Sequence, residues 1–475
     1  MKVRAFRLAL AVLATALVSP GCSDDDDYLR IAVTGDDPTL SIAPLELHVR
    51  VSGSGRSTSF DYRAARKPVP DLSDFTISLG PDATGPLDVL VSTRPSGDSV
   101  DWGGDVRVTL PAGGRTIKLP IAQGETPLPT IATLDGDLVT AAPFGSQVVL
   151  AWPTIGKRAA IAPINPDDLG GIERAPEIGN EVSRVRVAAR PSGDFTSELF
   201  AVSWIEDGST PMLKTETRTE RFDASDIGGG KRASDLHVAC ARRELTPAIV
   251  SATFTDGQIT LRGHDESGKI TRGPYEPAEL ARVNRIAGLA ITPDDTVTIA
   301  ANGDQASLVQ VNMSSGAVVH RQALEGQVAA MTLNGDGTRL FVATVVGLGD
   351  EGVLRLEVYS VRTPTRTREP VVVSPYPFIA GSTLSRVSLS SCAMAWPERV
   401  ADGTDGVRTR YQQIDIDGDP TGESHAANVA ETGVHFAPTV VCLSPTRAFI
   451  TFISAGQAEA DTGSLSLRRL PFATR

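Results

Sequence analysis

The sequence predicts an all-β protein, and three observations carry that prediction. The 44 glycines and 32 prolines fall between short runs of Val, Ile, Leu, Thr and Phe, as turn residues do between strands. Apolar residues make up 41% of the chain and charged residues 21%, which is the balance of a globular protein. Similar strand-like segments recur along most of the chain, whereas helical periodicity is scarce. Because 475 residues exceed one ordinary hydrophobic core, we expect several domains or a repeat array.

The first 21 residues have the three parts of a signal peptide. Basic residues precede an apolar stretch at residues 8–18, and small residues follow up to Gly21. The apolar stretch covers roughly half of a bilayer's hydrocarbon core, and no later segment approaches the ~20 apolar residues that a membrane span requires. We therefore predict that residues 1–21 are a cleaved export signal.

The segment Val18-Ser-Pro-Gly-Cys22 resembles a bacterial lipobox, in which a small residue precedes an obligatory cysteine. Ser19 and Pro20 depart from the Leu and the Ala or Ser that lipoboxes usually carry at these places. The resemblance implies that Cys22 carries a diacylglycerol thioether and, after cleavage, a fatty acid such as palmitate on its amino group. It predicts a lipoprotein held to a membrane. The alternative is ordinary cleavage near Gly21 with a free Cys22.

The residues after the cysteine suggest a location in the cell envelope. Ser23 stands where an Asp would resemble an inner-membrane retention signal, so the resemblance implies the outer membrane, facing the periplasm or the cell surface. The acidic run at residues 24–27 makes residues 22–27 a charged tether. A calcium site there is not favoured, because a flexible acidic run lacks a preorganised oxygen cage.

Residues 28–123 contain six short runs of alternating character, separated by turn residues. These runs are residues 29–33, 45–51, 75–79, 87–91, 106–110 and 116–121. Their length and spacing are typical of a small antiparallel sandwich, so we predict an immunoglobulin-like β-sandwich. The label covers architecture only, because the sequence shows neither the cysteine pair nor the buried-tryptophan framework of antibody domains.

A second region begins after Thr126-Pro-Leu-Pro129, where two prolines in four residues predict a domain boundary. Beyond it, seven similar strand segments recur at separations of 44 to 56 residues. They end at Trp152, Trp204, Phe254, Ala300, Thr344, Trp396 and Phe452. A turn before several of these segments and a hairpin after them, as at Asn312–Gly316, give four strands per unit. Strand-only units with a period near fifty indicate propeller blades.

Two segments of this region carry a family resemblance. Ile291-Thr-Pro-Asp-Asp-Thr-Val-Thr-Ile-Ala300 and Leu333-Asn-Gly-Asp-Gly-Thr-Arg-Leu-Phe-Val-Ala343 resemble the blade motif of YVTN-type and lactonase-like (WD40-like) β-propellers. The resemblance implies a propeller, which we expect to have seven blades, over residues 130–475, and it carries over no catalytic residue. Residues 464–470 would close the ring beside the strand near Ile131. Six or eight blades, or two successive sandwiches, are alternatives.

The spacing of the candidate metal ligands does not match known metal-binding motifs. Acidic residues at 415, 417, 419 and 423 could converge on calcium, but Pro420 and Ala426 stand where an EF-hand loop needs Gly and Glu, and a hairpin turn explains the run. The histidines show no HxH or HExxH spacing. They are His48, His237, His264, His320, His425 and His435. We therefore predict no metal, no cofactor and no catalytic residue.

The remaining cysteines and tryptophans have structural interpretations. Cys240, Cys392 and Cys442 can form at most one internal pair, and we favour a disulfide between Cys392 and Cys442 because they lie in neighbouring units. Unpaired buried cysteines are the alternative. The three tryptophans that end strand segments occupy equivalent places, which favours packing between blades over a stacking surface for sugars.

The charge and the motifs limit the possible functions. A net charge of -12, with no long run among the 45 basic residues, argues against nucleic acid as a partner. The chain has no G-x-S-x-G elbow, Walker loop or dinucleotide-binding glycine pattern. We predict a membrane-anchored, non-enzymatic envelope scaffold that binds protein or polysaccharide, and the oligomeric state stays open. The alternative is a propeller hydrolase or lactonase-like enzyme whose catalytic groups meet at the axial channel.

Overall fold

The structure, a computed structural model, describes most of the chain after residue 27. It describes residues 28–35, 46–53, 56–63, 67, 71–79, 84–93, 102–110, 116–123, 126–132, 139–154, 156–165, 175–190, 198–242, 247–292, 294–347, 352–374, 386–399, 407–427, 434–445, 447–455 and 462–470. The predicted signal peptide, Cys22 and the acidic tether lie outside these residues. The described residues are mainly β-strand, with one short 3-10 helix at Ala278–Leu280, as the all-β prediction requires. None of their helices is long and apolar enough to cross a membrane.

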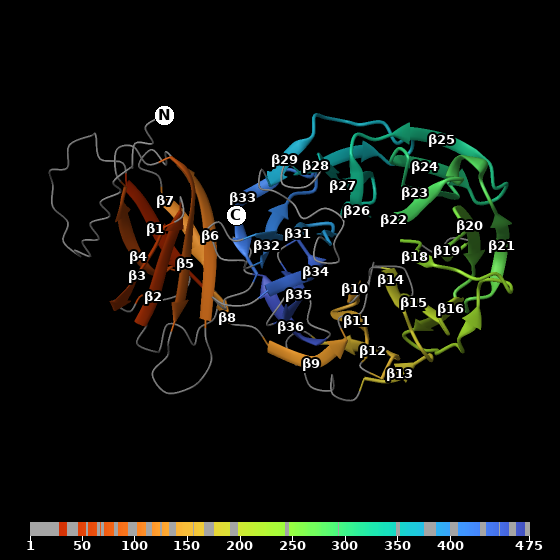
Figure 1. Cartoon of the computed structure of the whole chain (residues 1–475), viewed down its shortest axis with the longest axis horizontal. Helices are drawn as coiled ribbons and strands as arrows, with labels where there is room; N and C mark the ends of the chain where they lie inside the picture. The colour runs from red at the N-terminus through yellow and green to blue at the C-terminus, as the bar shows by residue number, and fades with distance from the viewer. Residues whose placement is uncertain are drawn as a thin grey trace, which may run out of the picture.

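The first eight strands form two sheets (Figure 1). They are β1 (Tyr28–Thr34), β2 (Glu46–Gly53), β3 (Arg56–Arg63), β4 (Asp71–Ser78), β5 (Gly85–Thr93), β6 (Trp102–Leu110), β7 (Thr116–Pro120) and β8 (Ala122–Gln123). One sheet has the order β4-β1-β7 and the other the order β3-β2-β5-β6-β8. Because successive side chains of a strand point to opposite faces, each strand contributes every second residue to the space between the sheets.

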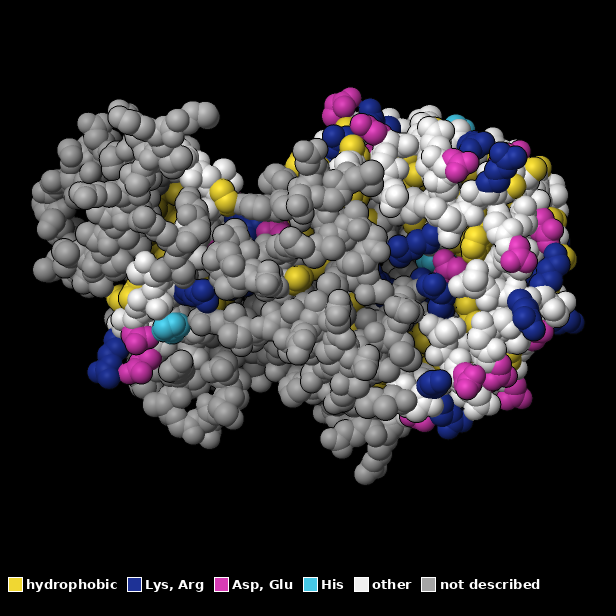
Figure 2. All heavy atoms as spheres, in the orientation of Figure 1, with side chains coloured by type: hydrophobic (Ala, Val, Ile, Leu, Met, Phe, Trp, Pro, Cys, Tyr) yellow, Lys and Arg dark blue, Asp and Glu magenta, His cyan; other side chains and the backbone are white. Residues whose placement is uncertain are grey.

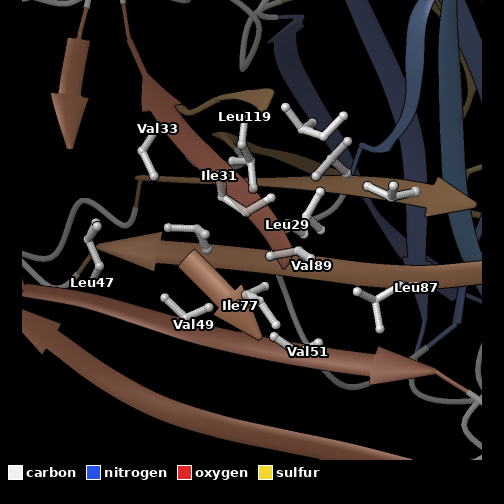
Figure 3. Close-up of a cluster of buried hydrophobic side chains, with 14 of the residues drawn as sticks. Leu29, Ile31, Val33, Leu47, Val49, Val51, Ile77, Leu87, Val89 and Leu119 are labelled. Carbon is white, nitrogen blue, oxygen red and sulfur yellow. The ribbon is translucent and has the colours of Figure 1, made fainter. Parts of the chain in front are cut away.

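Branched aliphatic side chains from both sheets fill this space (Figure 3). Leu29 and Ile31 of β1 and Val49 and Val89 of the facing sheet have no exposed surface. Burial of each such side chain stabilises the fold by roughly 1.5–3 kcal/mol before entropy is counted. Two sheets around one apolar core are the arrangement of a sandwich.

Strand β3 was not among the runs predicted from the sequence. It is an edge strand rich in Ser and Arg, and its aromatic residues Phe60 and Tyr62 are only partly buried, so its apolar signal is weak. Gly103 and Gly104 lie inside β6, before the predicted run at residues 106–110. A Cβ atom at Gly104 would lie 2.2 Å from the Pro120 carbonyl oxygen, so the glycine permits the close approach of β7.

The remaining strands form four-stranded antiparallel groups set around an axis (Figure 1). The innermost strands are β10 (Thr140–Phe144), β14 (Arg184–Arg190), β18 (Asp235–Cys240), β22 (Val283–Thr292), β26 (Gln327–Leu333), β30 (Ser388–Leu389) and β34 (Val434–Ser444). The second strands are β11 (Gln147–Pro153), β15 (Leu199–Glu206), β19 (Ile249–Thr255), β23 (Thr296–Gly303), β27 (Arg339–Val346), β31 (Ala393–Arg399) and β35 (Arg447–Ala455). The third strands are β12 (Ala159–Ile164), β16 (Thr210–Thr217), β20 (Gln258–His264), β24 (Ser307–Asn312), β28 (Val353–Ser360), β32 (Val407–Ile414) and β36 (Thr462–Leu470). The outermost strands are β13 (Glu177–Ile178), β17 (Ser225–Asp226), β21 (Ile270–Tyr275), β25 (Val318–Ala323), β29 (Val371–Ser374), β33 (Pro420–Ala426) and β9 (Thr126–Ala132).

Five of these groups are separate sheets, and the last two are joined by a single parallel bridge between Val407 and Val434. The second strands are buried along almost their whole length, as in β15, because neighbouring sheets cover both of their faces. Four-stranded sheets around a common axis make this region a β-propeller, as predicted.

The ring closes through a strand from its own beginning. Strand β9 pairs antiparallel with β36, and Gly463 lies opposite Ile131, so the predicted closure is confirmed. The segment Thr126–Pro129, whose two prolines predicted a domain boundary, is part of β9 at the edge of its sheet. An edge strand tolerates proline because only one side of its backbone needs partners.

The sandwich meets the propeller through a buried group of charged side chains, which we call the ion cluster: Asp88, Asp105, Arg107, Glu398 and Arg410. Arg107 of β6 donates two hydrogen bonds to Asp88, at 2.7 and 2.8 Å, and a third to Glu398 of β31. Arg410 of β32 lies 3.4 Å from Asp105 and 3.6 Å from Asp88. The cluster therefore links two strands of the sandwich to two strands of the propeller.

Burial and pairing act on these charges in opposite directions. Burial alone would raise the pKa of Asp88, but the hydrogen bonds from Arg107 and the charge of Arg410 together lower it. Burial raises the pKa of Asp105, which the charges of Arg410 and Arg408 only partly oppose. Burial would lower the pKa of Arg107, but its bonds to Asp88 and the charge of Glu398 raise it. Pairing with arginine thus outweighs burial at Asp88, whereas burial outweighs pairing at Asp105.

Candidate functional site

The innermost strands surround a cavity of about 1020 Å³ on the propeller axis. All seven strands of the innermost set contribute to its wall. Most of the wall consists of small or aliphatic side chains, such as Ala141, Val187, Ala329 and Met331. Among the described residues that line the cavity, none is Phe, Tyr or Trp. The cavity is therefore an apolar channel rather than an aromatic groove.

Arginine side chains lie at the end of the channel where the innermost strands begin. Arg186 is the third residue of β14, Arg285 is the third residue of β22, and Arg386 lies two residues before β30. Because the repeated strand order makes all innermost strands run in one direction, these three arginines lie toward the same end. We call this end the arginine rim. Figure 2 shows Lys and Arg side chains, with a histidine and an acidic side chain, gathered over the middle of the ring.

Arg186 is held in place at this rim by its neighbours on β18. Its guanidinium lies 4.0 Å from the Asp235 carboxylate and 3.4 Å from Nε2 of His237. Asp235 also lies 3.7 Å from Arg184. One carboxylate therefore faces two guanidinium groups, and Arg285 and Arg386 add two more guanidinium groups to the rim.

The opposite end of the channel has charges of both signs. Arg242 donates hydrogen bonds to the carbonyls of Asn334 and Gly335, and burial lowers its pKa against the charge of Asp336. Burial would raise the pKa of Asp336, but hydrogen bonds from the hydroxyl and N–H of Thr338 lower it. This aspartate is thus an ionised turn residue with a structural role.

The acidic residues at 415–423, which the sequence favoured as a hairpin turn over a calcium site, form a hairpin. Asp415 accepts hydrogen bonds from the backbone N–H groups of Asp417 and Asp419, at 2.9 and 2.8 Å, as an Asx-type turn does. Asp417 pairs with Arg339 and Asp419 with Arg368. Among the described residues, no group of three or more His, Cys, Asp or Glu side chains could hold a metal ion.

One histidine forms a pair that has the geometry of a nucleophile and its base. Nδ1 of His264 lies 3.0 Å from the Gly268 carbonyl, and Nε2 lies 2.8 Å from the Ser251 hydroxyl. Both side chains are buried within one sheet, at 0% and 1% exposure, so a substrate cannot reach them. Burial lowers the pKa of His264 to about 4. The pair is a satisfied polar contact in the core.

The other histidines are dispersed over the molecule. His48 pairs with Asp61 in the sandwich, His320 lies on the outermost strand β25, and His425 bonds the Asp105 carbonyl beside the ion cluster. His237 lines the channel. The side chain of His435 lies outside the described residues. The structure therefore brings only His237 to the candidate site.

Two of the three remaining cysteines form a disulfide. Cys392, next to β31, and Cys442 of β34 are joined across neighbouring strand groups, with their Cα atoms 6.0 Å apart, which is the pairing favoured from the sequence. Cys240 is a free thiol that lines the channel. Desolvation raises the pKa of Cys240 to about 12, so its thiolate is scarce at neutral pH.

The three predicted packing tryptophans lie between neighbouring groups of strands. Trp152 shares a core with Phe449, Trp204 with Phe144, and Trp396 with Leu354, each from the adjacent group. Their exposed fractions are 2%, 2% and 1%. These side chains therefore pack between blades, as predicted, and offer no surface to a sugar ring.

The arginine rim was not predicted from the sequence. Its arginines form no run along the chain, because one comes from each of three distant units. Aligning the units on their innermost strands, rather than on the segments that follow, could have shown arginines recurring near the strand starts.

Comparisons with known proteins give no family. No family model and no curated protein matches this chain. Among solved structures, the chain is similar to the β-propeller domain of Cps50 (Swd1) from Myceliophteria thermophila, with a TM-score of 0.44 and 11% identity over 72% of this chain and 99% of the other. It is also similar to Kuenenia stuttgartiensis hydrazine synthase, with a TM-score of 0.41 and 10% identity over 68% of this chain and 97% of the other.

Proposed function

We propose that this protein is a bacterial envelope lipoprotein whose propeller is a non-enzymatic binding scaffold for a protein or a polysaccharide. In this proposal, residues 1–21 direct export, and residues 22–27 form a tether lipidated at Cys22, with the outer membrane as the destination. Residues 28–123 form an immunoglobulin-like sandwich, and residues 130–475 form a seven-bladed propeller.

The axial channel is the observation that carries the scaffold role. Its lining combines apolar walls with arginines, which suits binding. Two carboxylates on its lining, Asp336 and Asp415, accept hydrogen bonds from backbone N–H groups of their own turns. The repeated sheets supply a large, rigid surface around the channel.

The hydrolase or lactonase-like alternative receives less support. It needs a nucleophile and an acid or base from different blades that converge in the channel, whereas Arg186 meets Asp235 and His237 there without a hydroxyl or thiol partner among these contacts. Within the described part of the chain, the nucleophile-like pair of Ser251 and His264 comes from a single sheet and is buried away from the cavity. For this reason the scaffold is our proposal.

Metabolic labelling tests the anchor. Cells that express the full chain are grown with a clickable palmitate analogue, and we expect labelling of the wild type but not of Cys22→Ser. Cys240→Ser is the matched control and should keep the label. Labelling that survives Cys22→Ser, or a wild type without label, would contradict the lipoprotein proposal.

Cosedimentation tests the scaffold role. The full chain with Cys22→Ser is mixed with isolated peptidoglycan, outer-membrane polysaccharide or outer-membrane proteins, and we expect saturable binding to one of these components. The same preparation is screened with lactone, ester and glycoside substrates. Turnover that disappears on substitution of a single channel residue would overturn the scaffold proposal in favour of the enzyme.

A further inference from the structure

The channel combines two features that select a ligand class. Its walls are mainly small and aliphatic, and no Phe, Tyr or Trp lies among the described lining residues, which disfavours stacking of neutral sugars. Its rim has Arg186, Arg285 and Arg386, which disfavours cations. A ligand that fits both the aliphatic walls and the arginine rim must have an apolar body and an anionic group.

The rim charge is a local property of this site. The chain as a whole has a net charge of -12, so its overall field repels anions. The arginines at one end of the cavity therefore contrast with the net negative charge of the whole chain. Guanidinium groups bind carboxylates through paired hydrogen bonds, and apolar walls that exclude water strengthen such pairs.

Arg285 is the arginine best placed to meet a ligand. It is exposed, lies on the innermost strand β22 and lines the cavity. Arg186 is buried beside Asp235, which partly neutralises it, so it contributes to the field more than to direct contact. Below the rim, Ala287, Leu289 and Ile291 continue along β22 as part of the lining. An anionic head at Arg285 could thus extend its apolar body along the strand.

We propose that the channel binds an organic carboxylate with an apolar body, with the carboxylate at the arginine rim and the body against the aliphatic wall. This inference rests on the proposed scaffold function and names the ligand class of its channel. It adds no reaction, because the lining offers positions for binding and not for bond cleavage.

Titration calorimetry with octanoate as the probe tests the inference. The full chain with Cys22→Ser should bind octanoate saturably, and octylammonium, which has the opposite charge, at least tenfold more weakly. Acetate should also bind at least tenfold more weakly, because it lacks the apolar body. Arg285→Ala should weaken octanoate binding roughly tenfold, as expected for loss of one charge-assisted contact.

Arg321→Ala is the matched control. Arg321 is an exposed arginine of β25, the outermost strand of the same sheet, so its removal changes the net charge equally but lies away from the channel. We expect it to leave octanoate binding unchanged. Thermal melting of both variants checks that each remains folded, which exposed positions should permit.

Two results would overturn the inference. One is the absence of saturable octanoate binding in the millimolar range, and the other is an equal effect of Arg285→Ala and Arg321→Ala. If the chain still cosediments with an envelope component, only the carboxylate site fails and the scaffold function stands. Loss of both would remove the scaffold proposal as well.

Discussion

At the scale of single residues, the buried His264 and the partly buried His425 make stability depend on pH. Burial lowers the pKa of His425 and of His264 to about 4 from an ordinary value of 6.5. Below about pH 6.5 the unfolded chain therefore takes up protons that the native protein cannot accept until about pH 4. Because the unfolded state binds more protons in this window, the free energy of unfolding falls as the pH falls through it. Above pH 6.5 these residues add no pH dependence.

His425 differs from His264 in its position, which permits a specific prediction. His425 lies between the sandwich and the propeller, and its Nδ1 is 2.5 Å from the Asp105 carbonyl. We expect His425→Gln to reduce the loss of unfolding free energy between about pH 7 and pH 4.5 by roughly 2 kcal/mol. Urea denaturation at each pH measures this. An unchanged pH slope in the variant would show that His425 does not titrate with folding.

The disulfide gives a second prediction at this scale. It closes a loop whose ends are 50 residues apart in sequence. Removing a cross-link of this span lowers the free energy of unfolding by about 4 kcal/mol, because the unfolded chain regains loop entropy. We expect Cys392→Ala/Cys442→Ala to show that loss in urea denaturation. Cys240→Ala, which removes only the free thiol, should not reproduce it; comparable losses in both variants would point to packing instead.

At the scale of strands, burial determined what the sequence could predict. Segments such as 149–152 on β11 were predicted because a strand covered on both faces reads as a continuous apolar run. The outermost strands β13 and β17 have two residues each and face solvent, so they have no periodicity to detect. The prolines of β9 argued against a central strand, and its edge position depends on pairing with β36, far along the chain.

The closure of the ring through β9 is testable by replacement. Residues 126–132 are exchanged for seven residues of Gly and Ser, which keep the chain length but form strands poorly. We expect the free energy of unfolding to drop by about 4 kcal/mol, as several backbone hydrogen bonds each contribute about 1 kcal/mol. An alternating Thr-Val replacement should recover most of the loss, since pairing depends on the backbone. Equal stability of the Gly-Ser variant and the wild type would exclude β9 as the closing strand.

At the scale of the whole molecule, the candidate site was the least predictable feature. Arg186 and Arg285 are 99 positions apart in the sequence, and neither lies in a local motif. Only the closed ring brings their strands to one axis. The same holds for Arg107 and Glu398, whose contact depends on how the sandwich packs against the propeller. Strand periodicity predicts the units of such a fold, but contacts between units depend on tertiary packing, which periodicity does not describe.

The ion cluster predicts that the sandwich and the propeller unfold together. Arg410 is buried at 1% exposure and faces both Asp105 and Asp88, so Arg410→Met leaves two buried carboxylates short of a partner. We expect this variant to lose about 3–5 kcal/mol of unfolding free energy. The single melting transition expected for the wild type should also split into two in this variant, because the sandwich is less firmly attached to the propeller.

A surface pair provides the comparison for this prediction. Arg339 pairs with Asp417 where both side chains are substantially exposed, so Arg339→Met should cost less than about 1 kcal/mol. Arg410→Met/Asp105→Asn should regain part of the loss, because it removes a carboxylate that the single variant leaves buried and underpaired. Calorimetry measures the transitions, and small-angle scattering measures the separation of the two parts. If Arg410→Met melts in one transition at the wild-type temperature, the cluster does not couple the sandwich to the propeller, and their attachment must depend on the neighbouring contacts of Arg468 and His425.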